Sequence, residues 1–259
     1  MPLVEFFSLA AVAMAAGAIN AVAGGGTLLT FPSLLFFGCP PTVANATSTL
    51  ALMLGTSGSL WGYRSHMPSI APWLARFAPV SLAGGAVGCL LLTRGGDKIF
   101  VAVVPFLVLF ASVLFVAQGA VRQLIRTEIS PGFVESPPLG ILALALAFQF
   151  LVSVYGGYFG AGIGILMLAA LGFLGFRNIH EMNAAKMVLS ALINLVASGW
   201  FLFSGLVDVP KAAVMTGGAV IGYFVGAHFS QKIPQAQVRR LIMVIGFSLS
   251  AVLFYRQFL

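Results

Sequence analysis

The chain has 259 residues, of which 60% are hydrophobic and only 7% are charged. A soluble domain carries roughly 25% charged residues, so this composition excludes a soluble globular protein. The net charge of +7 comes from cations scattered between apolar segments, which indicates membrane topology and headgroup contact rather than nucleic-acid binding. We therefore predict an all-α polytopic membrane protein that is embedded in the lipid bilayer.

Apolar segments of about 20 residues, the length that spans a bilayer, follow one another along the chain. The first covers about 3–22 and is expected to be retained, because Glu5 stands where a cleaved signal peptide carries positive charge. A glycine break, a short segment near 27–38 and three longer segments near 43–63, 70–93 and 98–119 follow. The second half has the same order, with segments near 139–160, 165–176, 180–204, 208–230 and 236–256, and the sequence GAGIG as its break.

The two halves match when the sequence is shifted by 138 residues, with glycine and asparagine positions recurring in order. The matched pairs are Gly24/Gly162, Gly26/Gly164, Asn45/Asn183, Gly84/Gly222 and Gly88/Gly226. We predict two repeats, 1–121 and 139–259, joined by a cytoplasmic linker loop over 122–138. The spacing of four residues in the last two pairs favours close helix packing.

The cations favour a topology in which each long segment and the short one after it form a hairpin. In that arrangement eight cations share one side (Arg64, Arg76, Arg122, Arg126, Arg177, Lys232, Arg239 and Arg240) and four take the other (Arg94, Lys98, Lys211 and Arg256). The positive-inside rule then places both termini outside the cytoplasm. Five passes per half also make the repeats inverted, an arrangement typical of transporters with a midplane binding site.

The glycine breaks are the first candidate binding feature. Unpaired backbone in the membrane is tolerated only inside protein or beside a water-filled cavity. Helix N-termini that begin after the breaks would attract anions, and glycines let an anion approach the backbone. Close helix packing is the alternative role for these glycines. The candidate residues are Gly24, Gly25, Gly26, Thr27, Gly162 and Gly164, with Asn20 and Tyr158 flanking the two breaks as caps or substrate contacts.

Lys186 is the most informative single residue, because it lies several residues inside a predicted membrane segment. A cation there costs about 3 kcal/mol or more to insert. It either faces a cavity and binds an anion or snorkels to the interface near Glu181 and His180. Polar residues accompany it on both halves, and they either contact substrate or bond across helices: Asn45, Thr47, Ser48, Asn183 and Ser190.

Several chemistries have no support in the sequence. The acidic residues lie near segment ends or in loops, which favours export of an anion driven by the membrane potential over proton- or sodium-coupled uptake. No Ser/His/acid set or metal cluster is present, so we expect no enzyme, cofactor or bound metal. Cys39 and Cys89 are read as small apolar residues, and a membrane thiol–disulfide carrier that uses both is the rival from another class.

The segments GAINAVAGGGTLLTFPSLLFFG with ANATSTL, and GGYFGAGIGILMLAALGFLGF with NAAKMVLSALIN, resemble the TauE/SafE (sulfite exporter, DUF81) family of membrane transporters. The resemblance covers essentially the whole chain. In the second motif, GAGIG replaces a glycine triplet, and Ala169 and Ala170 stand where a proline would be expected. Lys186 matches a lysine often present in that motif. The resemblance implies transport of sulfite or small organosulfur anions across a bacterial cytoplasmic membrane.

The sequence therefore predicts a transporter that exports a small sulfur-containing anion by alternating access. An ion-coupled uptake permease is the rival within the same architecture, and a homo-oligomer is compatible with the sequence. Trp61 and Trp200 also match across the halves, at a shift of 139, and are weaker candidates for the cavity wall.

Overall fold

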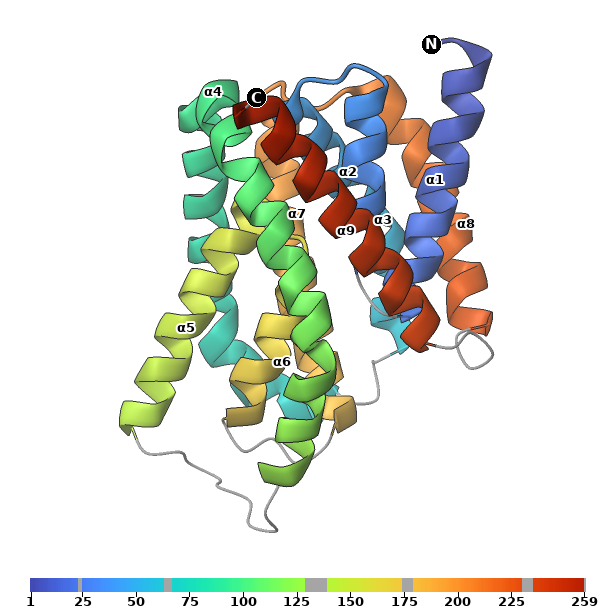
Figure 1. Cartoon of the computed structure of the whole chain (residues 1–259). Coiled ribbons are helices and arrows are strands. Elements are labelled where there is room, and N and C mark those ends of the chain that lie inside the picture. Colours follow the sequence, from blue (N-terminus) through green and yellow to red (C-terminus); the bar gives the residue numbers. More distant parts are fainter. Residues whose placement is uncertain (23–24, 63–66, 129–138, 174–178, 230–234, 259) are drawn as a thin grey trace.

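The computed structural model describes residues 1–22, 25–62, 67–128, 139–173, 179–229 and 235–258. These residues form a bundle of helices, and the part of the chain that the model describes contains no strand (Figure 1). The helices are α1 (Leu3–Val22), α2 (Thr27–Phe36), α3 (Pro41–Gly62), α4 (Met67–Glu128), α5 (Leu139–Tyr158), α6 (Ile163–Phe173), α7 (Ile179–Phe203), α8 (Val209–Phe229) and α9 (Gln235–Phe258). The prediction of an all-helical membrane protein is confirmed.

The long helix α4 consists of two arms. A continuous helix of 62 residues would be about 93 Å long, roughly three times the hydrocarbon thickness of a bilayer. Gly96 breaks it with non-helical angles (φ 63°, ψ −174°), and the chain turns back there (Figure 1). The arms correspond to the predicted segments 70–93 and 98–119, but the second arm stays helical to Glu128. The first seven residues of the expected linker loop are therefore helical, and 129–138 lie outside the described residues.

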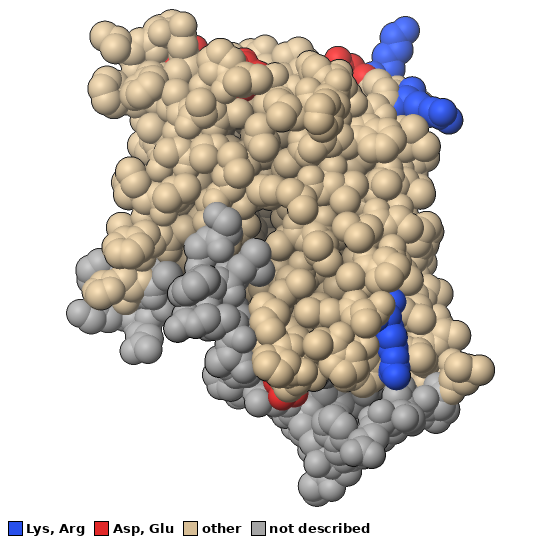
Figure 2. Space-filling view, turned by 180° about the vertical axis from the view of Figure 1, so that it is seen from behind, with Lys and Arg blue, Asp and Glu red and all other residues tan. Residues whose placement is uncertain are grey.

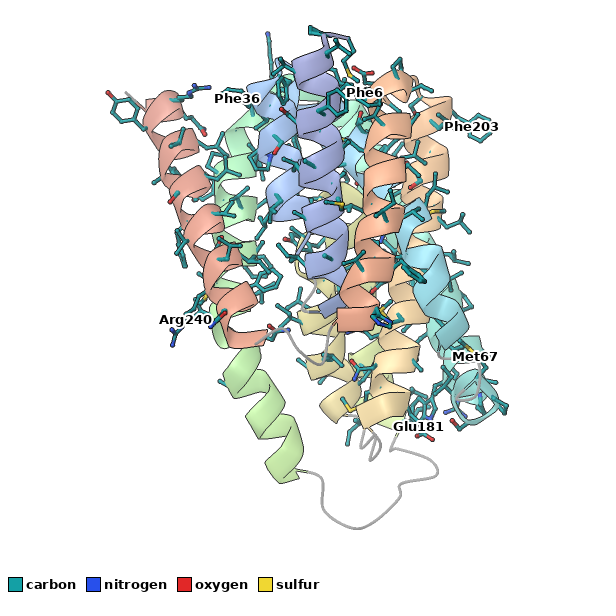
Figure 3. All side chains as sticks on the ribbon, turned by 90° about the vertical axis from the view of Figure 1, so that its right-hand side faces the viewer. Phe6, Phe36, Met67, Glu181, Phe203 and Arg240 are labelled. Atoms are coloured by element: carbon teal, nitrogen blue, oxygen red, sulfur yellow. The ribbon has the colours of Figure 1, made fainter. Side chains whose placement is uncertain are left out.

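The ends of the helices show how the broken segments fold back. Phe6 near the start of α1 and Phe36 at the end of α2 lie at the same end of the molecule, whereas Met67 and Glu181 lie at the opposite end (Figure 3). The α5–α6 pair opens toward that opposite end, and both chain termini lie at the end where α1 begins (Figure 1). This agrees with the predicted hairpins. The inverted repeat and the side of the membrane that holds the termini stay predictions.

The outer surface is apolar over most of its height. Six described helices are long and apolar enough to cross a membrane by length and composition: α1, α4, α5, α7, α8 and α9. Large apolar side chains such as Phe203 and Leu139 are more than four-fifths exposed. On the face shown in Figure 2, the described charged side chains lie toward the two ends and leave an uncharged band between them. The molecule therefore presents a lipid-facing belt.

Glycines hold two helix pairs at very short range. A methyl group at Gly222 of α8 would overlap the Met14 carbonyl of α1, and one at Gly226 would lie 2.6 Å from the Ala18 Cα atom. On α4, a methyl group at Gly84 would lie 2.7 Å from the Phe150 carbonyl oxygen of α5. The predicted packing role of this glycine spacing is confirmed. It joins α1 to α8 and α5 to α4, so the first helix of each half packs on a helix of the other half.

Candidate functional site

The first break lies between α1 and α2, and a side chain from α1 caps it. Gly25 has φ +93°, a conformation that side-chain-bearing residues rarely adopt. Asn20 Oδ1 accepts a hydrogen bond from the Gly26 backbone N–H at 2.8 Å, and Asn20 Nδ2 donates to the Tyr223 hydroxyl of α8 at 2.6 Å. One backbone donor at the start of α2 is therefore bound by protein. Gly24 lies outside the described residues.

The second break lies between α5 and α6 and has the same character. Gly160 (φ +80°) and Gly162 (φ +78°) have left-handed backbone angles. The Tyr155 hydroxyl donates to the Ala161 carbonyl at 2.7 Å, which ties the end of α5 to the break. The Tyr158 carbonyl, on the last residue of α5, accepts from Asn45 Nδ2 at 3.0 Å. Backbone groups at this break are therefore partly bound by side chains, one of them from α3.

Aromatic rings bring the two breaks together. Phe31 of α2 meets Phe159 of the second break edge to face, with ring centroids 5.5 Å apart. Phe115, on the second arm of α4, is buried with its ring against Gly25, and a methyl group at Gly162 would lie 3.8 Å from that ring. Sequence reasoning missed Phe115. Its only signal was the ASVLF segment that matches SAVLF in the other half.

Lys186 lies on α7, seven residues after the first residue of that helix, and is half-buried. Its ammonium nitrogen is 3.2 Å from Asn183 Oδ1, as the spacing of three residues on one helix face predicts. A methyl group added at Gly164, in the first turn of α6, would lie 3.2 Å from Lys186 Cδ. The lysine stem therefore lies against the N-terminal turn of α6. Ser190, one turn further along α7, donates to the Met167 sulfur at 3.2 Å.

The polar residues of α3 are buried but point to different partners. Thr47 Oγ1 accepts the Asp208 backbone N–H at 3.0 Å, so this hydroxyl secures the α7–α8 connection. The Ser48 hydroxyl pairs with Thr30 of α2. Thr27 is half-buried as the first residue of α2. Within the described part of the chain, Asn45 is the one of these three α3 residues whose side chain is hydrogen-bonded to a residue at a break. The contacts of these residues with substrate stay predictions.

A second charged cluster lies at the end of the molecule where the chain begins. Lys211 Nζ of α8 is 2.9 Å from Glu5 Oε1 of α1, 3.6 Å from Asp208 Oδ2 and 3.2 Å from Cys39 Sγ. The Lys211 and Glu5 side chains are only 16% and 12% exposed. This cluster connects α1, α8 and the α2–α3 connection. Sequence reasoning counted Lys211 only as a topological charge.

The two cysteines have separate surroundings. Both thiols are free and buried, and burial raises the pKa of the Cys39 thiol. Cys39 Sγ accepts from Lys211, whereas Cys89 Sγ contacts the Gly157 carbonyl at 3.5 Å. A thiol carrier needs reactive thiolates, and burial of this kind disfavours them. Among the described residues, no group of three or more His, Cys, Asp or Glu side chains is arranged to hold a metal ion.

Comparison with known proteins agrees with this architecture. Residues 9–253 match the family model described as "Sulfite exporter TauE/SafE". A "Probable membrane transporter protein" of Haemophilus influenzae is 30% identical over 248 residues, which cover 95% of this chain and 93% of that protein. The probable membrane transporter proteins YfcA of Escherichia coli K12 (28% identical; 94% and 87% covered) and YunE of Bacillus subtilis (24%; 93% and 93%) are also similar.

No solved structure matches the chain. The family match covers nearly all of the chain, including both breaks and the lysine of α7. The chain therefore belongs to the TauE/SafE family and is a membrane transporter.

Proposed function

We propose that this transporter exports a small anion, sulfite or a short organosulfonate, across the bacterial cytoplasmic membrane. Two inverted repeats would expose a midplane site alternately to the two sides, and the membrane potential would drive the export. The family description supports a sulfur oxyanion, and the site described above supports an anion.

One observation carries the proposal: the Lys186 side chain lies against the first turn of α6, inside a membrane-spanning helix. The N-terminus of a helix bears about half a positive charge. A lysine side chain beside such a terminus adds its positive charge to the same region of the bundle, and ionisable residues inside membrane-spanning helices commonly mark the path of a substrate or an ion. Asn183 accepts from the ammonium and so fixes the direction of the side chain.

The breaks supply the rest of the site in this proposal. Glycines with left-handed angles have no side chains of their own, so an anion could approach the backbone of the breaks more closely than at other residues. Asn20 and Tyr155 would hold each break in shape while an anion binds and leaves. Phe115, between the two breaks, would separate the site from one side of the membrane.

The charge distribution supports potential-driven export. The described acidic side chains lie in first turns, at the Gly96 turn or in a connection, which are the positions of Glu5, Glu181, Asp97 and Asp208. A potential of 100 mV provides about 2.3 kcal/mol for each exported negative charge, so such export needs no coupling ion.

The test is anion flux in proteoliposomes at a set membrane potential, with sulfite, sulfate, a short sulfonate and chloride. We expect flux of a sulfur anion that Lys186→Ala abolishes. Lys98→Ala is the matched control, because Lys98 is an exposed cation outside the site, and it should leave the flux unchanged. Absence of sulfur-anion flux in the wild type would refute the proposal. Flux that requires a sodium or proton gradient would favour the uptake permease instead, and flux lost on Cys39→Ser with Cys89→Ser would revive the thiol carrier.

A further inference from the structure

Asn45 on α3 is buried, with 1% of its surface exposed. Of the two polar groups of its side-chain amide, only the NH₂ group forms a hydrogen bond within the described residues. Its Nδ2 donates to the Tyr158 carbonyl at 3.0 Å. Its Oδ1 is buried and has no hydrogen-bond partner among the described residues. A carbonyl can only accept, so the contact with Tyr158 fixes the NH₂ group on that side and leaves the amide oxygen as the open atom.

The other half of the chain shows what a satisfied amide looks like at this position. In the register that aligns the halves, Asn45 corresponds to Asn183 and Ser48 corresponds to Lys186. Asn183 Oδ1 accepts from the Lys186 ammonium at 3.2 Å. Ser48 offers no such donor to Asn45, because its hydroxyl pairs with Thr30. The amide oxygen of Asn45 in the first half therefore lacks a donor, whereas the amide oxygen of Asn183 in the second half has the Lys186 ammonium as its donor.

Asn45 lies where the two hairpins meet. Asn45 is bonded to the carbonyl of Tyr158, and the next residue, Phe159, packs on Phe31 of α2. An amide oxygen carries partial negative charge, so it repels a bare anionic oxygen and accepts from an O–H or N–H group. A buried acceptor of this kind is costly when empty and gains a bond when such a donor arrives.

We propose that Asn45 Oδ1 accepts a hydrogen bond from the transported anion and selects anions that carry a donor group over anions that lack one. This rests on the proposed function and adds a substrate class to it: sulfur oxyanions with a hydroxyl, a protonated oxygen or an amine. A hydrogen-bond donor fits this atom better than a metal cation. One acceptor satisfies an O–H group, whereas hard cations in proteins take about six oxygen ligands.

The test uses two probes that differ by one donor, 2-hydroxyethanesulfonate and ethanesulfonate. Their fluxes are compared in proteoliposomes of wild type, Asn45→Leu and Asn183→Leu. The wild type should transport 2-hydroxyethanesulfonate roughly tenfold faster or more, because ethanesulfonate leaves the buried Asn45 Oδ1 without a hydrogen bond. Asn45→Leu should bring the ratio of the two fluxes close to one. Asn183→Leu is the matched control, and it should lower both fluxes while leaving their ratio unchanged.

Protection of the wild-type protein against heat by each anion gives a second readout, in case Asn45→Leu does not fold. The hydroxylated anion should protect at roughly tenfold lower concentration. Equal fluxes and equal protection in the wild type, or a preference that survives in Asn45→Leu, would overturn the inference and leave the proposed function standing. A sodium requirement that disappears in Asn45→Leu, with no preference between the anions, would assign the oxygen to a cation instead. Neither flux nor protection with either anion, in protein that transports sulfite, would overturn this inference alone, whereas absence of sulfite flux as well would refute both proposals.

Discussion

The packing of α4 against α5 leads to a prediction about two adjacent glycines. A methyl group at Gly84 would lie 2.7 Å from both the Phe150 carbonyl oxygen and Ser153 Cβ. At Gly85, the nearest atom to a new methyl group would be Ile193 Cγ2 at 3.5 Å, which is ordinary van der Waals contact. Gly84→Ala should therefore destabilise the protein, whereas Gly85→Ala should be neutral or stabilising.

The expected size follows from a comparison of the two variants. Each replaces glycine by alanine inside the same helix, so both gain about 1 kcal/mol of helix propensity, and this gain cancels in the difference. Relief of the clash at Gly84 requires α4 and α5 to separate locally by about 0.7 Å, because one of the contacted atoms is a backbone oxygen that cannot rotate away. Overpacking of this kind costs about 1 to 3 kcal/mol, so we expect Gly84→Ala to be less stable than Gly85→Ala by that amount.

The assay is unfolding of the purified protein in mixed micelles with increasing SDS, followed by circular dichroism, for wild type and both variants. The free energies of unfolding should rank Gly85→Ala at or above wild type and Gly84→Ala below it. Equal stability of the two variants would refute the close approach of α4 and α5 at Gly84. Destabilisation by Gly85→Ala alone would show that the helix face is assigned wrongly.

Three further predictions concern the first break, the charged cluster and the topology. Gly25→Ala should abolish anion flux, because the φ of +93° at Gly25 disfavours a side chain and the new methyl group would overlap the Phe115 ring. Adding Phe115→Leu removes the overlap but not the unfavourable φ, so it should not restore flux. Lys211→Met should destabilise the protein by about 3 kcal/mol in the SDS titration, because it leaves a poorly exposed Glu5 carboxylate without its partner, and adding Glu5→Gln should recover part of that loss. A C-terminal reporter that is active only in the cytoplasm should stay inactive, and activity would place the termini on the cytoplasmic side.

Hydropathy and helix breakers predicted the order of the helices, because apolar length and interruption are properties of the local chain. The predicted first segment, 3–22, is the helix Leu3–Val22, and the predicted segment 139–160 is Leu139–Tyr158. Glycine spacing also predicted close packing correctly. The glycine spacing did not identify the partner helix, because small residues allow a neighbouring helix to approach closely but do not determine which helix it is.

The candidate site was predictable to the extent that it depends on unusual local chemistry. A lysine and several glycines within apolar segments stand out in any sequence, whereas a phenylalanine such as Phe115 looks like many others. Thr47 and Ser190 illustrate the opposite case, since both are polar residues at the expected spacing whose hydroxyls bond to Asp208 and Met167. These partners depend on the direction in which each side chain points from its helix, and tertiary packing determines what lies in that direction.

The packing of each hairpin on a helix of the other half has a consequence for the proposed alternating access. Hairpin α1–α2 is attached to α8 by backbone contact at Gly222 and by the hydrogen bond from Asn20 to Tyr223. A motion that carried the hairpin alone would separate surfaces that fit without intervening side chains, which forfeits most of their dispersion contacts. We therefore expect α8 to move with α1 and α2 as one body, and α4 to move with α5 in the same way. Each moving body would then contain helices of both halves. The two breaks would separate or approach at the contact between Phe31 and Phe159 and beside Phe115, which packs on Gly25.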